Sequence, residues 1–222
     1  MTTRAAKSRG MPKRSKGAAR SSSPPWLLIV GGVAAIAVVA ILAVFLSQPA
    51  SGEISEPATK PLAIEGQSLP GLPDSGTDAA VGQALPRLVG TGVKGEIVEI
   101  GPANGAQAIV VVAHWCPHCQ VEIPQLSAWL ADHPLPEGVR LVTLSTAIDP
   151  ARPNYPPSAW LEREGWPGPV LTDDAESSGL ASLGLNAFPG FVFVNADGTV
   201  ASRATGEVGT DAFAAGIASI AP

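Results

Sequence analysis

The longest run of apolar residues in the chain lies near its N-terminus. Residues 26–46 read WLLIVGGVAAIAVVAILAVFL, which is 21 positions without a charged side chain. A helix that crosses a bilayer needs about 20 such residues, because each adds about 1.5 Å along the helix axis. The alternative is a cleaved signal peptide, whose apolar region is shorter and ends at a small-residue cleavage site. The length of the run and the poor fit of residues 47–51 to such a site favour an uncleaved transmembrane helix.

The hydrophobic pattern changes twice after this run. Residues 47–77 carry five prolines and show no periodic apolar pattern, which is typical of an extended, solvated linker. From residue 78 onward, short apolar runs alternate with stretches of helical periodicity, as in a folded domain. The sequence therefore divides into a basic tail (1–25), a transmembrane helix (26–46), a Pro/Gly-rich linker (47–77) and a globular domain (78–222).

A continuous apolar run rich in β-branched residues at 107–113 predicts a strand buried on both faces. Residues 139–145 predict the next buried strand, and residues 170–172 a short strand. Residues 96–100 alternate between polar and apolar, as in a strand with one solvent-facing side. A hairpin is predicted where two further apolar runs, 191–194 and 199–202, flank the turn sequence Asn-Ala-Asp-Gly.

Helices are expected between and after these strands, over residues 117–131, 158–165, 174–183 and 209–220. Strands joined by crossover helices are parallel, whereas a terminal hairpin adds antiparallel strands. The pattern therefore predicts an α/β fold with a mixed sheet and helices on both faces. In the first helix, four residues are expected to face the core: Val121, Leu126, Trp129 and Leu130.

Charge is divided unevenly along the chain. Seven of the 14 Lys and Arg residues precede Trp26, where there is no acid, and the other seven share the remainder with all 19 Asp and Glu. The tail therefore carries a formal charge of +7 and the rest −12. Basic residues stay on the cytoplasmic side of a membrane helix, so the N-terminus is expected inside and the globular domain outside the cytoplasm. The acidic domain argues against nucleic-acid binding, which needs clustered Lys and Arg.

The candidate chemistry lies in the segment Trp115-Cys116-Pro117-His118-Cys119, which holds both cysteines of the chain. A buried strand precedes it, and Pro117 suits the first turn of a helix, so Cys116 is expected at the helix N-cap. The helix dipole, and His118 when charged, favour the thiolate of Cys116. Cys116 is therefore the expected nucleophile of thiol–disulfide exchange, and Cys119, one turn into the helix, the resolving cysteine.

Other interpretations of the cysteine pair remain open at this stage. A structural disulfide at this spacing closes a very small loop and stabilises the fold little. A copper or zinc site is the alternative function, with Cys116, Cys119 and either His118 or His114 as ligands of a metallochaperone. A tethered interaction domain, in which the cysteines only stabilise the fold, is a third interpretation.

The arrangement of strand, WCPHC segment and helix resembles the thioredoxin fold. Residues 119–124, Cys-Gln-Val-Glu-Ile-Pro, resemble the C-x-x-E-x-P continuation of the TlpA/ResA branch of membrane-tethered thiol–disulfide oxidoreductases. Phe188-Pro189-Gly190 resembles the cis-proline loop of that branch. The resemblance implies a cis Pro189 that faces the cysteine pair, and substrate contacts at Phe188 and Trp115. Glu122 is expected either to interact with the N-terminus of the helix in which it lies or to relay a proton from Cys119.

Three departures from that branch leave the direction of electron flow open. The dipeptide Pro117-His118 is that of DsbA, the periplasmic disulfide donor. Phe188 is bulkier than the usual residue before the cis-proline, and Val110 replaces the buried acid that thioredoxin carries six residues before its first active-site cysteine.

The expected function is therefore a membrane-anchored, extracytoplasmic thiol–disulfide oxidoreductase that needs no cofactor beyond its cysteine pair. It would reduce protein disulfides, as TlpA and ResA do, or donate them, as DsbA does. Its expected partners are proteins that carry cysteines or disulfides, and a membrane protein that restores its redox state.

Overall fold

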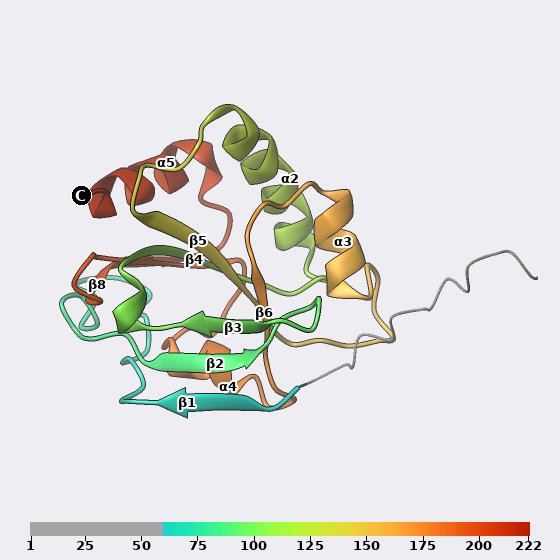
Figure 1. The fold of residues 1–222 in the computed structure, drawn as a ribbon, viewed down its shortest axis with the longest axis horizontal. Coiled ribbons are helices and arrows are strands. Elements are labelled where there is room, and N and C mark those ends of the chain that lie inside the picture. The colour runs from blue at the N-terminus through green and yellow to red at the C-terminus, as the bar shows by residue number, and fades with distance from the viewer. Residues whose placement is uncertain (1–59) are drawn as a thin grey trace, which may run out of the picture. The chain divides into compact units, whose positions relative to one another are not determined.

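A computed structural model describes residues 60–222, and Figure 1 shows their fold. The predicted basic tail, the predicted transmembrane helix and the linker up to residue 59 lie outside the described residues. Within residues 60–222, no helix has both the length and the apolar character needed to span a bilayer.

The central sheet has five strands in the order β6-β5-β4-β7-β8. Their bounds are β4 Ala106–Val112, β5 Val139–Ser145, β6 Val170–Thr172, β7 Gly190–Val194 and β8 Val200–Thr205. Strands β4, β5 and β6 are parallel, whereas β7 pairs antiparallel with β4 and β8 antiparallel with β7. The predicted mixed sheet is thereby confirmed. The register pairs Val112 with Ser145, so the parallel strands end at one edge of the sheet, and the WCPHC segment begins there.

Residues of β4 point alternately into two cores, as expected for a central strand. Val110 belongs to the core formed with α2 (Pro117–Asp132), α3 (Pro157–Arg163) and α5 (Gly209–Ile220). Val111 belongs to the core on the opposite face, which α4 (Ser178–Ser182) and a second sheet cover. Figure 1 shows α2 and α5 on one side of the central sheet and α4 with β1 and β2 on the other. Helices thus lie on both faces, but a sheet covers much of the second one.

One predicted core position of α2 is wrong. Val121 is 46% exposed, whereas Cys119, Ile123, Leu126 and Leu130 form the buried face of the helix. These four positions recur at intervals of three and four residues, which is the helical repeat, and Val121 falls off that stripe. Trp129 is partly buried and packs against the core.

The second sheet is antiparallel, in the order β1-β2-β3, with bounds Leu62–Glu65, Arg87–Thr91 and Ile97–Ile100. Strand β1 lies in the segment that the sequence assigned to the linker, so that assignment is wrong from residue 62 onward. A four-residue strand among prolines shows too little pattern to be recognised, and its pairing with β2 stabilises it. Leu69 is also buried, and its N–H donates to the Ser182 carbonyl.

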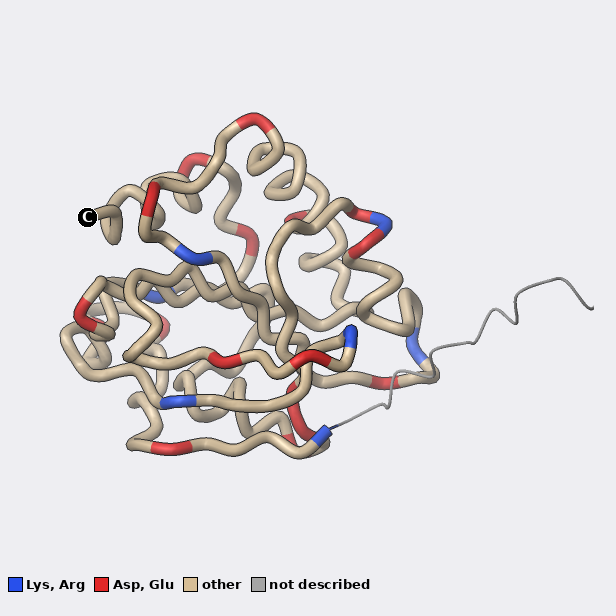
Figure 2. Tube along the Cα trace, viewed as in Figure 1, with Lys and Arg blue, Asp and Glu red and all other residues tan. Residues whose placement is uncertain are grey.

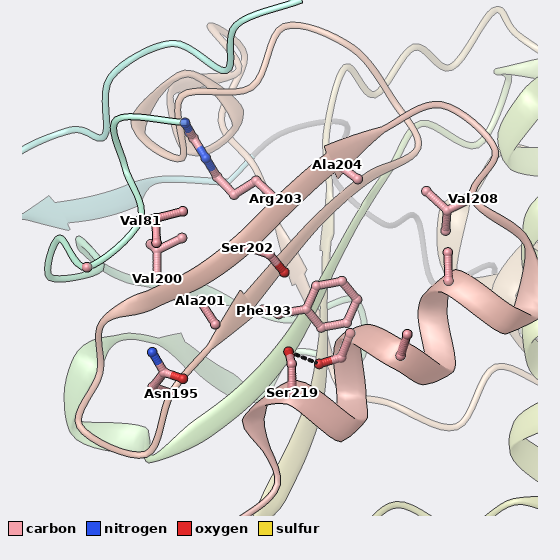
Figure 3. A pocket seen from close by; sticks show the side chains of 14 residues that line it. Val81, Phe193, Asn195, Val200, Ala201, Ser202, Arg203, Ala204, Val208 and Ser219 are labelled. Atoms are coloured by element: carbon pink, nitrogen blue, oxygen red, sulfur yellow. Dashed lines mark hydrogen bonds between the residues drawn. The ribbon is translucent and has the colours of Figure 1, made fainter. Parts of the chain in front are cut away.

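Arg203 of β8 fixes residues 70–78 to the central sheet. Its side chain is fully buried, forms an ion pair with Asp78, and donates to the carbonyls of Pro70 (2.9 Å) and Leu183 (2.7 Å). Beside it, a groove of about 630 Å³ lies between β8 and α5 (Figure 3). Small side chains such as Ala201, Ala212 and Ser219 line the groove, and neither cysteine contributes to it.

Figure 2 shows the charged residues of the described part. The Lys and Arg residues lie on separate elements, with acidic residues between them. This distribution gives residues 60–222 no basic patch of the kind that neutralises a nucleic-acid backbone.

Candidate active site

The cysteine pair lies where β4 leads into α2. Cys116 is the N-cap of α2, in extended backbone conformation, and Pro117 occupies the first turn. The Cys116 carbonyl accepts the N–H of Gln120 at 3.0 Å, the first hydrogen bond of the helix. Both cysteines are free thiols, and the Sγ of Cys116 therefore lies at a helix N-terminus, where an anion is favoured.

Cys119 is buried behind Cys116. It has no exposed surface, whereas Cys116 keeps 5% of its own. Burial raises the pKa of the Cys119 thiol strongly. A hydrogen bond with the Ala113 backbone lowers this pKa to a smaller extent, and the charges of Cys116 and Glu122 raise it further. Cys119 thus stays protonated in the reduced protein, and it needs a base before it can attack.

The cis-proline loop faces the first cysteine. The Phe188–Pro189 peptide bond is cis, as the sequence resemblance implied. The Cys116 thiol donates to the Phe188 carbonyl, with 3.5 Å between Sγ and O. Backbone groups of this loop are therefore within reach of a chain bound to Cys116.

Two aromatic rings and one guanidinium form the rim beside the thiol. The rings of Trp115 and Phe188 meet edge to face with centroids 5.5 Å apart. Trp115 Nε1 donates to the Ala147 carbonyl at 2.7 Å, which fixes the ring. The Arg152 guanidinium carbon lies 4.5 Å from the centroid of the Trp115 ring. Nothing in the sequence marked Arg152, because it comes from the proline-rich loop of residues 149–157 and meets Trp115 only in the fold.

His114 holds that proline-rich loop against the site. It is fully buried, its Nδ1 lies 2.7 Å from the Pro153 carbonyl, and its Nε2 accepts the Asp149 N–H at 3.2 Å. Since Nε2 accepts, the proton resides on Nδ1 and the ring is neutral. These bonds anchor the loop to the end of β4, so His114 positions the loop beside the site.

His118 contacts a residue that the sequence did not point to. Its Nδ1 lies 2.6 Å from Oε1 of Glu207, in the turn before α5. The two side chains are 67% and 40% exposed. The polar partner of His118 in the described structure is thus a carboxylate and not a sulfur. Glu207 lies 89 residues further along the chain, and only its flanking glycines marked a turn there.

Glu122 also contacts the turn before α5. It is 1% exposed, and its Oε1 accepts the N–H groups of Val208 (3.1 Å) and Gly209 (2.9 Å). The carboxylate thus binds the N-terminus of α5, and not that of its own helix α2 as the sequence predicted. The charge of Glu122 also raises the pKa of the Cys119 thiol, as the smallest of the contributions. Val110, at the position of thioredoxin's acid, is buried and apolar.

The metal interpretation lacks a third ligand in this arrangement. Within residues 60–222, no three His, Cys, Asp or Glu side chains gather closely enough to hold an ion. Both ring nitrogens of His114 are engaged by loop backbone, and Nδ1 of His118 is engaged by Glu207.

Comparisons with known proteins agree with this geometry. The family profile of Redoxin matches residues 80–216. Among solved structures, a protein described as thiol:disulfide interchange protein DsbE from Chlorobium tepidum is similar, with 17% identity over 63% of this chain and 97% of that one, and a TM-score of 0.53. The thioredoxin domain of a thiol-disulfide oxidoreductase from Bacteroides vulgatus has 18% identity over 64% and 99% of the two chains, and a TM-score of 0.50.

Comparison with curated proteins gave no match. At these identities, the two solved structures establish a common fold, which is the thioredoxin fold. The family profile spans more than half of the chain and includes both cysteines, the cis-proline and Glu122. The protein therefore belongs to the Redoxin family.

Proposed function

We propose that this protein is a membrane-tethered, extracytoplasmic thiol–disulfide oxidoreductase that acts through Cys116 and Cys119. Protein disulfide oxidoreductase chemistry is what the Redoxin family and the fold support; the tether, the compartment and the residue roles are our proposal. The observation that carries it is the placement of the Cys116 thiol at a helix N-terminus, 3.5 Å from the carbonyl before a cis-proline, with Cys119 buried behind it.

The first step is attack of the Cys116 thiolate on a substrate disulfide. A bond forms between Cys116 Sγ and one substrate sulfur, and the other substrate sulfur leaves as a thiolate that takes up a proton. The helix dipole stabilises the attacking anion before the step, and the leaving thiolate carries the negative charge after it.

The second step is attack by Cys119 on the mixed disulfide. Cys119 gives its proton to the Glu122 carboxylate, and its sulfur then bonds to Cys116 Sγ. The second substrate sulfur leaves as a thiol after protonation. Two electrons have passed to the substrate, and the protein holds a Cys116–Cys119 disulfide. The reverse sequence donates that disulfide to a dithiol.

The substrate is a protein segment in extended conformation. The backbone at Phe188 supplies hydrogen-bonding groups beside the reacting sulfur, and such groups select a chain conformation more than particular side chains. The rings of Trp115 and Phe188 form an apolar wall next to that backbone.

The membrane tether rests on the apolar run of residues 26–46 and on the basic residues before it. In intact cells, a membrane-impermeant maleimide should label Cys116 of the reduced full-length protein, and fractionation should place that protein in the membrane. Labelling only after lysis, or recovery in the soluble fraction, would contradict the tether and its orientation.

The exchange activity is tested with the purified full-length protein in detergent. Wild type should equilibrate with glutathione and form one intramolecular disulfide. Cys116→Ser should abolish exchange, whereas Cys119→Ser should stop at a mixed disulfide with glutathione. A Cys116→Ser variant that exchanges as fast as wild type would refute the assigned roles.

The same titration gives the direction of electron flow. A reduction potential near about −120 mV would make the protein a disulfide donor, and one near about −270 mV a reductant.

A further inference from the structure

Glu207 connects the turn before α5 to the active-site segment. Its carboxylate accepts a hydrogen bond from His118 Nδ1 at 2.6 Å, and His118 lies between the two cysteines in the sequence. This contact forms between exposed side chains, so its meaning depends on whether the backbone around Glu207 is itself held in place.

The turn is held on both sides of Glu207. The Gly206 N–H donates to the carbonyl of Pro189 at 2.9 Å, which ties the turn to the cis-proline loop. The N–H groups of Val208 and Gly209 donate to Glu122 on α2. The residue that carries the carboxylate is therefore fixed to both halves of the redox site.

The shape of the turn also depends on its glycines. Gly206 and Gly209 have φ values of +83° and +72°, a conformation that other residues rarely adopt. Four consecutive residues thus form a turn, tied by backbone hydrogen bonds at Gly206, Val208 and Gly209, that presents one carboxylate to His118.

The electrostatic consequence concerns the Cys116 thiolate. A positively charged His118 alone would stabilise that thiolate, which favours the reduced form and makes the disulfide more oxidising. A carboxylate 2.6 Å from the imidazole offsets most of its charge as seen from the sulfur, because an ion pair acts at a distance as a dipole.

We propose that Glu207 is a positioning residue that binds His118 and thereby makes the Cys116–Cys119 disulfide less oxidising than the Pro117-His118 dipeptide implies. This inference rests on the proposed function. The protein would then contain the Pro117-His118 dipeptide of a disulfide donor and still have a cysteine pair with a more negative reduction potential.

The test is the glutathione equilibrium constant of the full-length protein in detergent for wild type, Glu207→Gln, His118→Ala and the double variant. It is measured about one pH unit below the ordinary imidazole pKa of about 6.5, where an imidazole is charged with or without a carboxylate partner. Glu207→Gln should favour the reduced form by about tenfold, equivalent to a potential about 30 mV more positive. In the His118→Ala background, the same substitution should change the constant by less than about twofold. Asp211→Asn, which removes an exposed carboxylate from the first turn of α5, is the matched control and should leave the constant unchanged.

A merely structural role would not produce this pattern. The thermal stability of the oxidised Glu207→Gln protein should equal that of wild type, and the thiolate absorbance of its reduced form should develop at lower pH. An unchanged or more negative potential in Glu207→Gln, or an equal shift in the His118→Ala background, overturns the inference. A wild-type protein that does not equilibrate with glutathione at all refutes the proposed function instead.

Discussion

Substitutions of Glu122 can separate a structural role of this residue from a chemical one. Its Oε1 accepts two backbone N–H groups of the α5 N-terminus, and its charge acts on the buried Cys119 thiol. Replacing Glu122 with Gln keeps an oxygen that can accept both N–H groups but removes the charge and the base. Replacing it with Ala removes both functions.

The two substitutions should differ in stability by an amount that follows from these bonds. Hydrogen bonds to a charged group contribute about 1.5–3 kcal/mol each and neutral ones about 1 kcal/mol, so weakening both bonds in Glu122→Gln should cost about 1–4 kcal/mol of unfolding free energy. Glu122→Ala leaves two N–H groups without an acceptor and should cost about 3 kcal/mol or more. Denaturant unfolding of the oxidised full-length protein measures both.

The kinetic effect has a sign that separates two mechanisms. If the carboxylate only repelled the Cys119 thiolate, its removal would make that thiolate easier to form, and the second step would accelerate. If the carboxylate is the base of that step, its removal should slow resolution of the mixed disulfide by about a hundredfold, while attack by Cys116 continues. Rapid-quench measurement of a preformed mixed disulfide distinguishes them, with Asp132→Asn at the far end of α2 as control. Resolution that is unchanged or faster in Glu122→Gln refutes the relay.

Four further predictions concern stability and metal binding. Arg203→Met should cost about 3–5 kcal/mol of unfolding free energy, because it leaves Asp78 without its buried partner. A loss below about 1 kcal/mol in denaturant unfolding would be inconsistent with a stabilising ion pair between Arg203 and Asp78. Hydrogen bonds from Arg203 lower the pKa of Asp78 in the folded protein. The stabilisation by this pair is therefore fully present above the unfolded pKa of about 3.9 and is lost as the pH falls through the lower pKa of the folded state. The unfolding free energies of wild type and Arg203→Met should become equal at that low pH. Cys119 has the opposite effect on the pH dependence of stability, because its pKa is raised in the folded protein. The reduced protein should keep its full stability below about pH 8.5, the pKa of an unfolded cysteine, and become less stable as the pH rises above it. Cys119→Ala should make this loss of stability smaller. Anaerobically purified protein should retain no stoichiometric copper or zinc by elemental analysis, and one equivalent bound at Cys116 and Cys119 would favour the metallochaperone instead.

The sequence predicts well what depends on long local patterns. The buried run at β4 is continuous and rich in β-branched residues, β5 is buried except at Arg140, and the turn Asn195–Gly198 has a strong hairpin sequence. The redox segment could be placed for the same reason, since a proline directly after Cys116 marks a helix start. Each of these features is determined by residues close together in the chain.

The remaining features depend on residues that meet only in the folded protein. Strand β1 is four residues long and exists through its pairing with β2. The partners of His118 and Trp115, which are Glu207 and Arg152, come from a turn and a loop with no helical or strand pattern. Glu122 has a visible place in the C-x-x-E-x-P segment, yet its contact with α5 spans more than 80 residues of sequence. Such pairings follow from tertiary packing and leave no local signature.

The measurement that tests the central claim most directly is capture of covalent intermediates by the Cys119→Ser variant of the full-length protein in cells that express it. After acid quenching and alkylation of free thiols, the account predicts disulfide-linked adducts between Cys116 and other proteins. These adducts should disappear on reduction and be absent from the Cys116→Ser/Cys119→Ser double variant. An absence of adducts, or adducts that persist without Cys116, would contradict thiol–disulfide exchange through this pair.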